Sequence, residues 1–220
     1  MNVAPCSDWL LYVIVDRTAA GTRNLADLTA AAIRGGADVI QLRDKTASTP
    51  QLIEEAAALL PLTRSAGIPL IINDRVEVLR AVGADGVHLG QDDLPIAEAR
   101  RLLGSERLIG QSTHSLEQAL AAEAAGADYI GFGPIFPTPT KPDYASVGTA
   151  LIGTVAKQVR LPLVCIGGID RTTIGHVLEA GARCVAVVRA VCRAEDPEAA
   201  TRALKRHLTQ SVLQSCGNCP

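Results

Sequence analysis

The sequence predicts an α/β fold, a single-domain (β/α)8 TIM barrel, on three observations. The chain of 220 residues alternates apolar, strand-like runs with Ala- and Leu-rich helical stretches eight times. The dipeptide Gly-Ala recurs four times, each time at the end of a helical stretch. The hydrophobic fraction is 48% but aromatic residues make up only 3%, so small aliphatic side chains must fill the core, as in helices packed on a parallel sheet. An open, doubly wound sheet is the alternative.

Each predicted strand is followed by a helical pattern, and this alternation predicts parallel pairing through right-handed crossovers. A glycine that ends a helix is typical of a C-terminal cap in the left-handed region. The three domain ranges predicted are an N-terminal extension over 1–9, the barrel over 10–208 and a disordered tail over 209–220. The predicted strands span 10–16, 38–44, 69–74, 86–90, 107–113, 129–135, 161–168 and 184–190.

The net charge of −2 gives no basic excess, which argues against nucleic acid or an anionic membrane as the main partner. No apolar run reaches the roughly 18 residues that span a bilayer. The first apolar run, 10–15, lacks a basic leader and a cleavage site, so a cytoplasmic location with reduced thiols is expected. Cys216 and Cys219 form a CxxC in the tail, which favours a frayed terminus over a metal or redox site. Whether the chain forms a homo-oligomer stays open.

Polar residues gather where the predicted strands end, which is the active-site face of such a barrel. In QLRDK the strand alternation places Gln41, Arg43 and Lys45 on one side. Two cations and an amide on one face suit an anion with several charges. The alternative is a solvated strand end that pairs with neighbouring helices.

Two carboxylates, Asp74 and Asp93, follow two neighbouring strands. Mg²⁺ takes one or two carboxylates together with phosphate oxygens and waters, so this pair beside the cations indicates a magnesium site. The alternative is helix capping, because Asn73 or Asp74 and then Asp93 each precede a helical pattern.

The stretch IGGID at 166–170 runs from a strand into two glycines. Glycines there let backbone N–H groups approach a phosphate, and barrels commonly bind phosphate after strands seven and eight. A tight turn with Asp170 as helix cap is the alternative. His114 is a possible general base, but Ser115 and Gln118 after it also fit a capping box at a helix start.

The loop from Phe136 to Val147 is longer than the roughly 2–6 residues of an ordinary connection in this fold class, and it holds prolines at 137, 139 and 142. It also carries Lys141. With the features above, the sequence describes a site that has two anion-binding ends. One end is cationic and metal-assisted and the other is built from backbone, which fits the joining of two phosphorylated substrates with loss of diphosphate.

The chain resembles the thiamine-phosphate synthase family over nearly all of 10–208. The motifs that carry this resemblance are, in chain order, QLRDK, HLGQDDLP, GQSTH, YIGFGPIFPTPTK and CIGGI. The resemblance implies a transferase that joins an aminopyrimidine-methyl diphosphate to a thiazole phosphate, with Mg²⁺ as cofactor. Thiamine phosphate and diphosphate would be released. A dissociative displacement of this kind needs no general base, because the thiazole nitrogen has a free lone pair.

The resemblance also implies roles for individual residues. Arg43, Lys45 and Lys141 would be catalytic, and Asp74 and Asp93 would bind the metal. The pyrimidine diphosphate would contact Gln41, Leu42, Arg43, Asp44, Lys45, Asn73, Ser112 and Lys141. The thiazole phosphate would contact Thr138, Pro139, Thr140, Gly168, Val188 and Arg189.

Arg189 departs from the family pattern, in which a small hydroxyl residue is expected. An arginine there would grip phosphate in a bidentate manner or change substrate preference. Two other functions stay open: a thiazole tautomerase of the same superfamily, with His114 as proton carrier, and a non-catalytic sensor of phosphorylated ligands. The retained cations and carboxylates argue against both.

Overall fold

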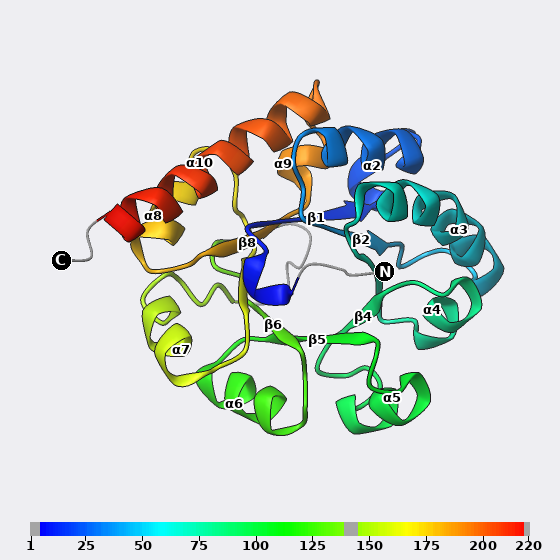
Figure 1. Cartoon of the computed structure of the whole chain (residues 1–220), viewed down its shortest axis with the longest axis horizontal. Helices are drawn as coiled ribbons and strands as arrows, with labels where there is room; N and C mark the ends of the chain where they lie inside the picture. Colours follow the sequence, from blue (N-terminus) through cyan, green and yellow to red (C-terminus); the bar gives the residue numbers. More distant parts are fainter. Residues whose placement is uncertain (1–4, 139–144, 218–220) are drawn as a thin grey trace.

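The computed structural model describes residues 5–138 and 145–217. Eight parallel strands close into a barrel in chain order, and each strand pairs with its two neighbours, β1 with β8 included. Helices surround this barrel (Figure 1). The strands are β1 (Leu11–Asp16), β2 (Val39–Arg43), β3 (Leu70–Asn73), β4 (Gly86–Leu89), β5 (Leu108–Thr113), β6 (Tyr129–Phe132), β7 (Leu163–Ile166) and β8 (Cys184–Val187). The predicted (β/α)8 barrel is confirmed, and the open sheet is excluded.

Helices α1 to α10 each follow a strand and pack on the outside of the barrel, whereas η1 precedes β1 and lies over one opening of the barrel (Figure 1). No helix of the described chain is both long and apolar enough to cross a membrane. In chain order the helices are the short η1 (Cys6–Asp8), α1 (Arg17–Ala20), α2 (Leu25–Arg34), α3 (Thr49–Ala66), α4 (Val76–Val82), α5 (Ile96–Leu103), α6 (Leu116–Ala124), α7 (Ile152–Gln158), α8 (Ile174–Glu179), α9 (Arg189–Cys192) and α10 (Pro197–Gly217).

The core has two layers because successive side chains of a strand point to opposite faces. On β2, Ile40 and Leu42 belong to the outer layer, between the barrel and its helices. Val39 belongs to the inner layer, inside the barrel. With apolar residues on both faces, the strands read as continuous hydrophobic runs.

The recurring Gly-Ala pairs place a glycine of positive φ at the end of a helix, as the sequence predicts. The glycine adopts a positive φ of between 72° and 100° in all four, and the alanine after it is buried. A residue with a side chain would be strained at such a φ. The four pairs lie at 36–37, 83–84, 126–127 and 181–182.

An aspartate follows three of these pairs, and the sequence reading did not use it. Asp38 Oδ2 accepts hydrogen bonds from the backbone N–H groups of Leu10 (2.9 Å) and Leu11 (2.8 Å), at the start of β1. Asp85 accepts in the same way from the N–H of Leu70, the first residue of β3. Asp128 accepts from the N–H of Ile109, near the start of β5. Each carboxylate thus ties the start of an even-numbered strand to the strand before it.

The two ends of the chain differ from the predicted boundaries. Trp9, placed in the N-terminal extension, is 2% exposed and packs edge-on against Tyr129, with ring centroids 5.2 Å apart. It therefore belongs to the inner core layer of the barrel, together with Tyr12 and Tyr129. At the other end the predicted tail is helical through Gly217, because 209–216 contain neither glycine nor proline to stop α10.

Candidate active site

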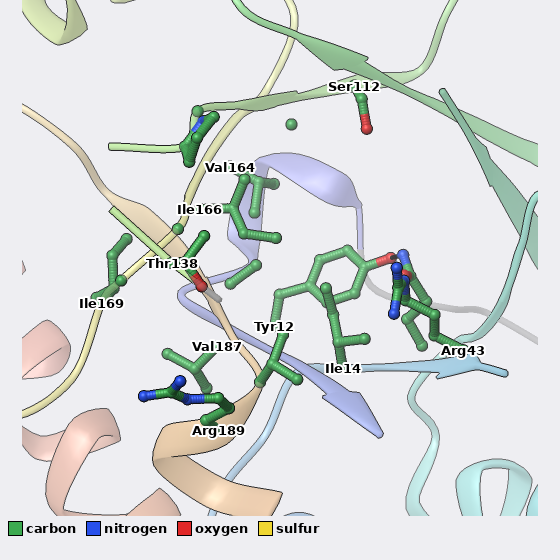
Figure 2. Close-up of a pocket in the computed structure, with 18 of the residues that line it drawn as sticks. Tyr12, Ile14, Arg43, Ser112, Thr138, Val164, Ile166, Ile169, Val187 and Arg189 are labelled. Carbon is green, nitrogen blue, oxygen red and sulfur yellow. Dashed lines mark hydrogen bonds between the residues drawn. The ribbon is translucent and has the colours of Figure 1, made fainter. Parts of the chain in front are cut away.

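A cavity of about 400 Å³ opens at the C-terminal ends of the strands. Its lining comes from all eight strands or the turns that follow them. Figure 2 shows Arg43 on one side of this cavity and Arg189 with Thr138 on the other. The cavity thus has two ends with a cationic side chain at each. The sequence patterns predict a cationic first end and a second end built from backbone, and the family resemblance adds Arg189 to the second.

At the first end, Gln41 and Arg43 point inward from β2 and line the cavity, as alternation predicts. Arg43 is ion-paired with Asp16, whose side chain is 2% exposed. Asp16 Oδ1 also accepts from the N–H of Ala19 at 2.7 Å, and this hydrogen bond caps the start of α1. The guanidinium is therefore held in place by a buried carboxylate, at the mouth of the barrel.

Three residues of the same motif, Leu42, Asp44 and Lys45, are not part of the cavity lining. Leu42 is fully buried in the outer core layer. Asp44 Oδ1 accepts from Thr46 N (2.8 Å) and Ala47 N (3.0 Å), closing the turn before α3. Burial would raise the pKa of Asp44, but these hydrogen bonds outweigh it and hold the pKa below its ordinary value.

Lys45, just beyond β2, is ion-paired with Asp74 just beyond β3. Burial is the main reason that the pKa of Asp74 lies above its ordinary value; the ion pair with Lys45 opposes this rise and neighbouring Asp93 adds to it. Asp74 has φ of 62°, and among the residues described it is the only non-glycine with positive φ. Strained backbone of this kind is typical of functional sites.

Asp93 Oδ2 accepts from the N–H of Gly90 at 2.6 Å, in the turn after β4. A side chain at position 90 would collide with this carboxylate, since a Cβ there would lie 2.9 Å from Asp93 Oδ2. Neither aspartate is a helix cap: the cap of α4 is Arg75 and that of α5 is Pro95. The capping alternative for this pair is therefore wrong.

The pair Asp74 and Asp93 fits Mg²⁺, which takes one or two carboxylates and completes its shell with phosphate oxygens and waters. No group of three or more His, Cys, Asp or Glu side chains forms a complete metal site anywhere in the described chain. A metal held here would therefore take its other ligands from substrate and water.

Asn73 and Ser112 both line the cavity. Ser112 Oγ lies 2.9 Å from Nε2 of His88, a residue of β4 that also lines the cavity. His114 lines it too, and its Nδ1 contacts the carbonyl of Gly133. Ser115 caps α6 as predicted, but the side chain of Gln118 accepts from His114 N rather than from Ser115 N.

At the second end, Thr138, Gly168, Val188 and Arg189 line the cavity as the resemblance implies. Gly168 has φ of 64°, and a Cβ there would lie 2.7 Å from the Cβ of Phe136. The glycines after β7 thus serve close packing of two loops, in addition to any role with phosphate. Asp170 Oδ1 accepts from the N–H groups of Thr172 and Thr173 in the turn before α8. The N-cap of α8 is Thr173, so the predicted helix cap at Asp170 is wrong. Pro139, Thr140 and Lys141 lie outside the described residues.

Sequence reading missed several cavity residues: Tyr12 on β1, Tyr129 on β6, His88 on β4, and Arg193 beyond α9. A signal for Tyr12 was present, because alternation from Asp16 backwards places Ile14 and Tyr12 on the inner face. Arg193 had only a helical spacing of four from Arg189 to indicate it.

Comparison with known proteins agrees with this site. Residues 11–191 match a family model described as thiamine monophosphate synthase. The thiamine-phosphate synthase of Roseiflexus sp. (strain RS-1) is 51% identical over 91% of this chain and 85% of its own. That of Chloroflexus aurantiacus is 51% identical over 93% of this chain and 95% of its own.

Among solved structures, the thiamine phosphate pyrophosphorylase of Pyrococcus furiosus superposes with a TM-score of 0.87. It is 38% identical, and the match covers 94% of this chain and 98% of that one. The likeness therefore extends over nearly the whole chain. The chain belongs to the thiamine-phosphate synthase family.

Proposed function

We propose that this chain joins an aminopyrimidine-methyl diphosphate to a thiazole phosphate, giving thiamine phosphate and diphosphate, with Mg²⁺ as cofactor. The family is one of transferases, and this chain is a transferase. The observation that carries the proposal is one cavity with Arg43 at one end and Arg189 at the other. Two phosphorylated substrates would place their anionic groups at these ends and their rings between them.

The protein's part in this reaction is electrostatic. Arg43 and Lys45 would bind the diphosphate and stabilise the charge that grows on it as it leaves. Mg²⁺ held by Asp74 and Asp93 would neutralise more of that charge. Lys141 is a further predicted contact of the diphosphate. The apolar inner wall, with Ile14, Val164 and Ile166, would hold the rings in position for attack by the thiazole nitrogen.

At the other end, the phosphate of the thiazole would be bound by Thr138, Gly168 and Arg189. Arg189 and Arg193 both line this end, and neither guanidinium contacts another side chain in the described parts of the molecule. A planar guanidinium binds phosphate in a bidentate manner, so Arg189 replaces the expected hydroxyl with a stronger anion contact.

A thiazole tautomerase is the rival function, favoured by the position of His114 in the cavity wall. A tautomerase needs a proton carrier and does not need the cation and carboxylate set at the first end. We also place the protein in the cytoplasm, where its two phosphorylated substrates would be made.

An assay that omits each substrate in turn separates these functions. With both substrates and Mg²⁺, thiamine phosphate and diphosphate should form in equal amounts, and neither should form when either substrate or the metal is left out. Isomerisation of a thiazole precursor in the absence of pyrimidine would instead support the tautomerase. Binding of both substrates by folded protein without any turnover would overturn the synthase proposal.

A further inference from the structure

A chain of hydrogen bonds runs through residues that line the cavity and joins five strands. It begins at Gln41 and ends at Ser112, two residues that the family resemblance assigns to the pyrimidine. The three residues between them have no assigned role. The contacts are Gln41 Nε2 to Tyr12 OH (2.8 Å), Tyr12 OH to Tyr129 OH (3.0 Å), Tyr129 OH to His88 Nδ1 (3.1 Å) and His88 Nε2 to Ser112 Oγ (2.9 Å).

The middle of this chain is sealed from solvent. Tyr12 is 1% exposed and Tyr129 is fully buried. Burial raises the pKa of both phenols well above their ordinary value, so each keeps its single proton. A buried hydroxyl that lies between only two polar neighbours can satisfy its proton only by donating to one of them, and it can accept from the other.

This requirement fixes the direction in which protons are donated along the hydrogen-bond chain. Because the amide N–H of Gln41 donates to Tyr12, the proton of Tyr12 is left for Tyr129. Tyr129 then donates to Nδ1 of His88. A neutral imidazole that accepts at Nδ1 carries its proton at Nε2, and this proton donates to Ser112 Oγ. If Tyr129 donated to Tyr12 instead, the proton of Tyr12 would be buried without an acceptor, which is costly.

The two ends of the hydrogen-bond chain then present opposite groups to the cavity, a donor at one end and an acceptor at the other. Ser112 Oγ has accepted from His88, so its own proton is available to a ligand. Gln41 has used its N–H group on Tyr12, and its Oε1 has no partner in the described parts of the molecule. Both residues line the cavity.

We propose that Tyr12, Tyr129 and His88 are positioning residues that make Ser112 a hydrogen-bond donor and Gln41 an acceptor toward the ligand. This pattern selects a heteroaromatic ring with an acceptor nitrogen and an amino group, and disfavours the oxo ring, whose N–H and C=O present the reverse pattern. The preference for an amino ring over an oxo ring rests on the proposed function. The donor and acceptor directions along the hydrogen-bond chain do not.

The tautomer of His88 in the ligand-free protein tests the polarity directly. Nitrogen NMR should show a neutral ring with its proton at Nε2, assigned by loss of the signals in His88→Asn. His176, exposed on α8, serves as an unrestrained reference in the same spectrum. Tyr129→Phe removes the donor to Nδ1, and the signals should move toward a mixture of tautomers. A proton at Nδ1, an imidazolium, or no change in Tyr129→Phe would each overturn the proposal.

Calorimetric binding of the pyrimidine diphosphate and of its 4-oxo analogue tests the selectivity. The native protein should prefer the amino compound at least about tenfold, and Tyr129→Phe should lose most of this preference. The Michaelis constant for the thiazole phosphate should stay unchanged, which a general loss of structure would not allow. Tyr12→Phe provides a second variant, and His176→Asn is the matched control. Equal affinity for both rings in the native protein would overturn the selectivity, while failure to bind either ring would count against the proposed function and leave the NMR result standing.

Discussion

Lys45 at the end of β2 and Asp74 at the end of β3 form an ion pair across two neighbouring strands. A cation predicted to bind diphosphate and a carboxylate predicted to bind Mg²⁺ therefore neutralise each other in the ligand-free protein. A metal bound at Oδ2 of Asp74 would compete with Lys45, and the released ammonium would then be available to the diphosphate. Metal binding and preparation of the diphosphate site would be linked through this one contact.

Replacing Lys45 with Gln should strengthen Mg²⁺ binding to the ligand-free protein and yet reduce turnover. The side chain of Lys45 is 52% exposed, so the pair contributes at most about 1 kcal/mol. Loss of this competition should tighten Mg²⁺ binding by up to about fivefold, measured by calorimetric titration. Turnover should fall because the diphosphate loses a cation.

Arg75→Gln is the matched control, because it removes one positive charge beside Asp74 without touching its carboxylate. Arg75 pairs with Glu77 at 2.5 Å. Tighter Mg²⁺ binding in this control as well would indicate a general charge effect. Weaker binding in Lys45→Gln would contradict the competition.

Asp93→Asn should separate the metal role of Asp93 from its structural role. The amide oxygen can still accept from Gly90 N, so the turn after β4 and the melting temperature should be kept within a few degrees. The lost charge should weaken Mg²⁺ binding and lower activity at limiting Mg²⁺ by more than about tenfold. Asp93→Ala should lose both thermal stability and activity at limiting Mg²⁺. If Asp93→Asn also lost stability and activity to an equal degree, the carboxylate would be structural.

The sequence predicted the barrel because its signals are local and repeated. Each strand-helix unit carries its own apolar run and, in four of them, a Gly-Ala pair whose glycine has a positive φ at the end of a helix. The inward side of β2 followed from alternation alone. The helical tail was missed because the last turns of α10 gain little from packing, with Leu213 67% exposed, so no apolar pattern marked them.

The hydrogen-bond chain inside the barrel could not be predicted in the same way. Tyr12 and Tyr129 are 117 residues apart, and each sits in an apolar run that reads as ordinary core. Only closure of the barrel brings β1 and β6 to face each other. The ion pair of Arg43 with Asp16 was missed for the same reason, since both residues were read one strand at a time.

Arg189→Ser tests whether the arginine at the second end of the cavity binds the thiazole phosphate. Loss of a bidentate, charge-assisted contact should raise the Michaelis constant for that substrate by about tenfold or more. The Michaelis constant for the pyrimidine diphosphate should stay the same, because its proposed partners, Arg43 and Lys45, lie at the other end. The native enzyme should also be more sensitive to salt than the variant.

Arg183→Ser is the control for this variant. Arg183 is exposed just before β8, at the opposite end of the barrel, and should leave both Michaelis constants unchanged. Arg193→Ser, a helical turn away from Arg189, should show a smaller effect of the same kind. An unchanged constant in Arg189→Ser would mean that Thr138 and Gly168 suffice for the phosphate.

Gly168→Ala should disturb the second end of the cavity through the backbone. A Cβ at position 168 would lie 2.7 Å from the Cβ of Phe136 and 3.0 Å from the carbonyl of Pro137, and φ is 64°. The strain should cost about 1–3 kcal/mol and lower the melting temperature by about 2–4 °C per kcal/mol. The Michaelis constant for the thiazole phosphate should rise, because the displaced loop carries Thr138.

Gly175→Ala makes the same chemical change where nothing lies within 4 Å of the new Cβ. Position 175 is inside α8, where alanine is the better helix former by up to about 1 kcal/mol. Its melting temperature should therefore stay the same or rise. If Gly168→Ala melted like Gly175→Ala and kept its Michaelis constant, the loops after β6 and β7 would have to be free to move apart, and the close packing at Gly168 would not set the shape of the phosphate end.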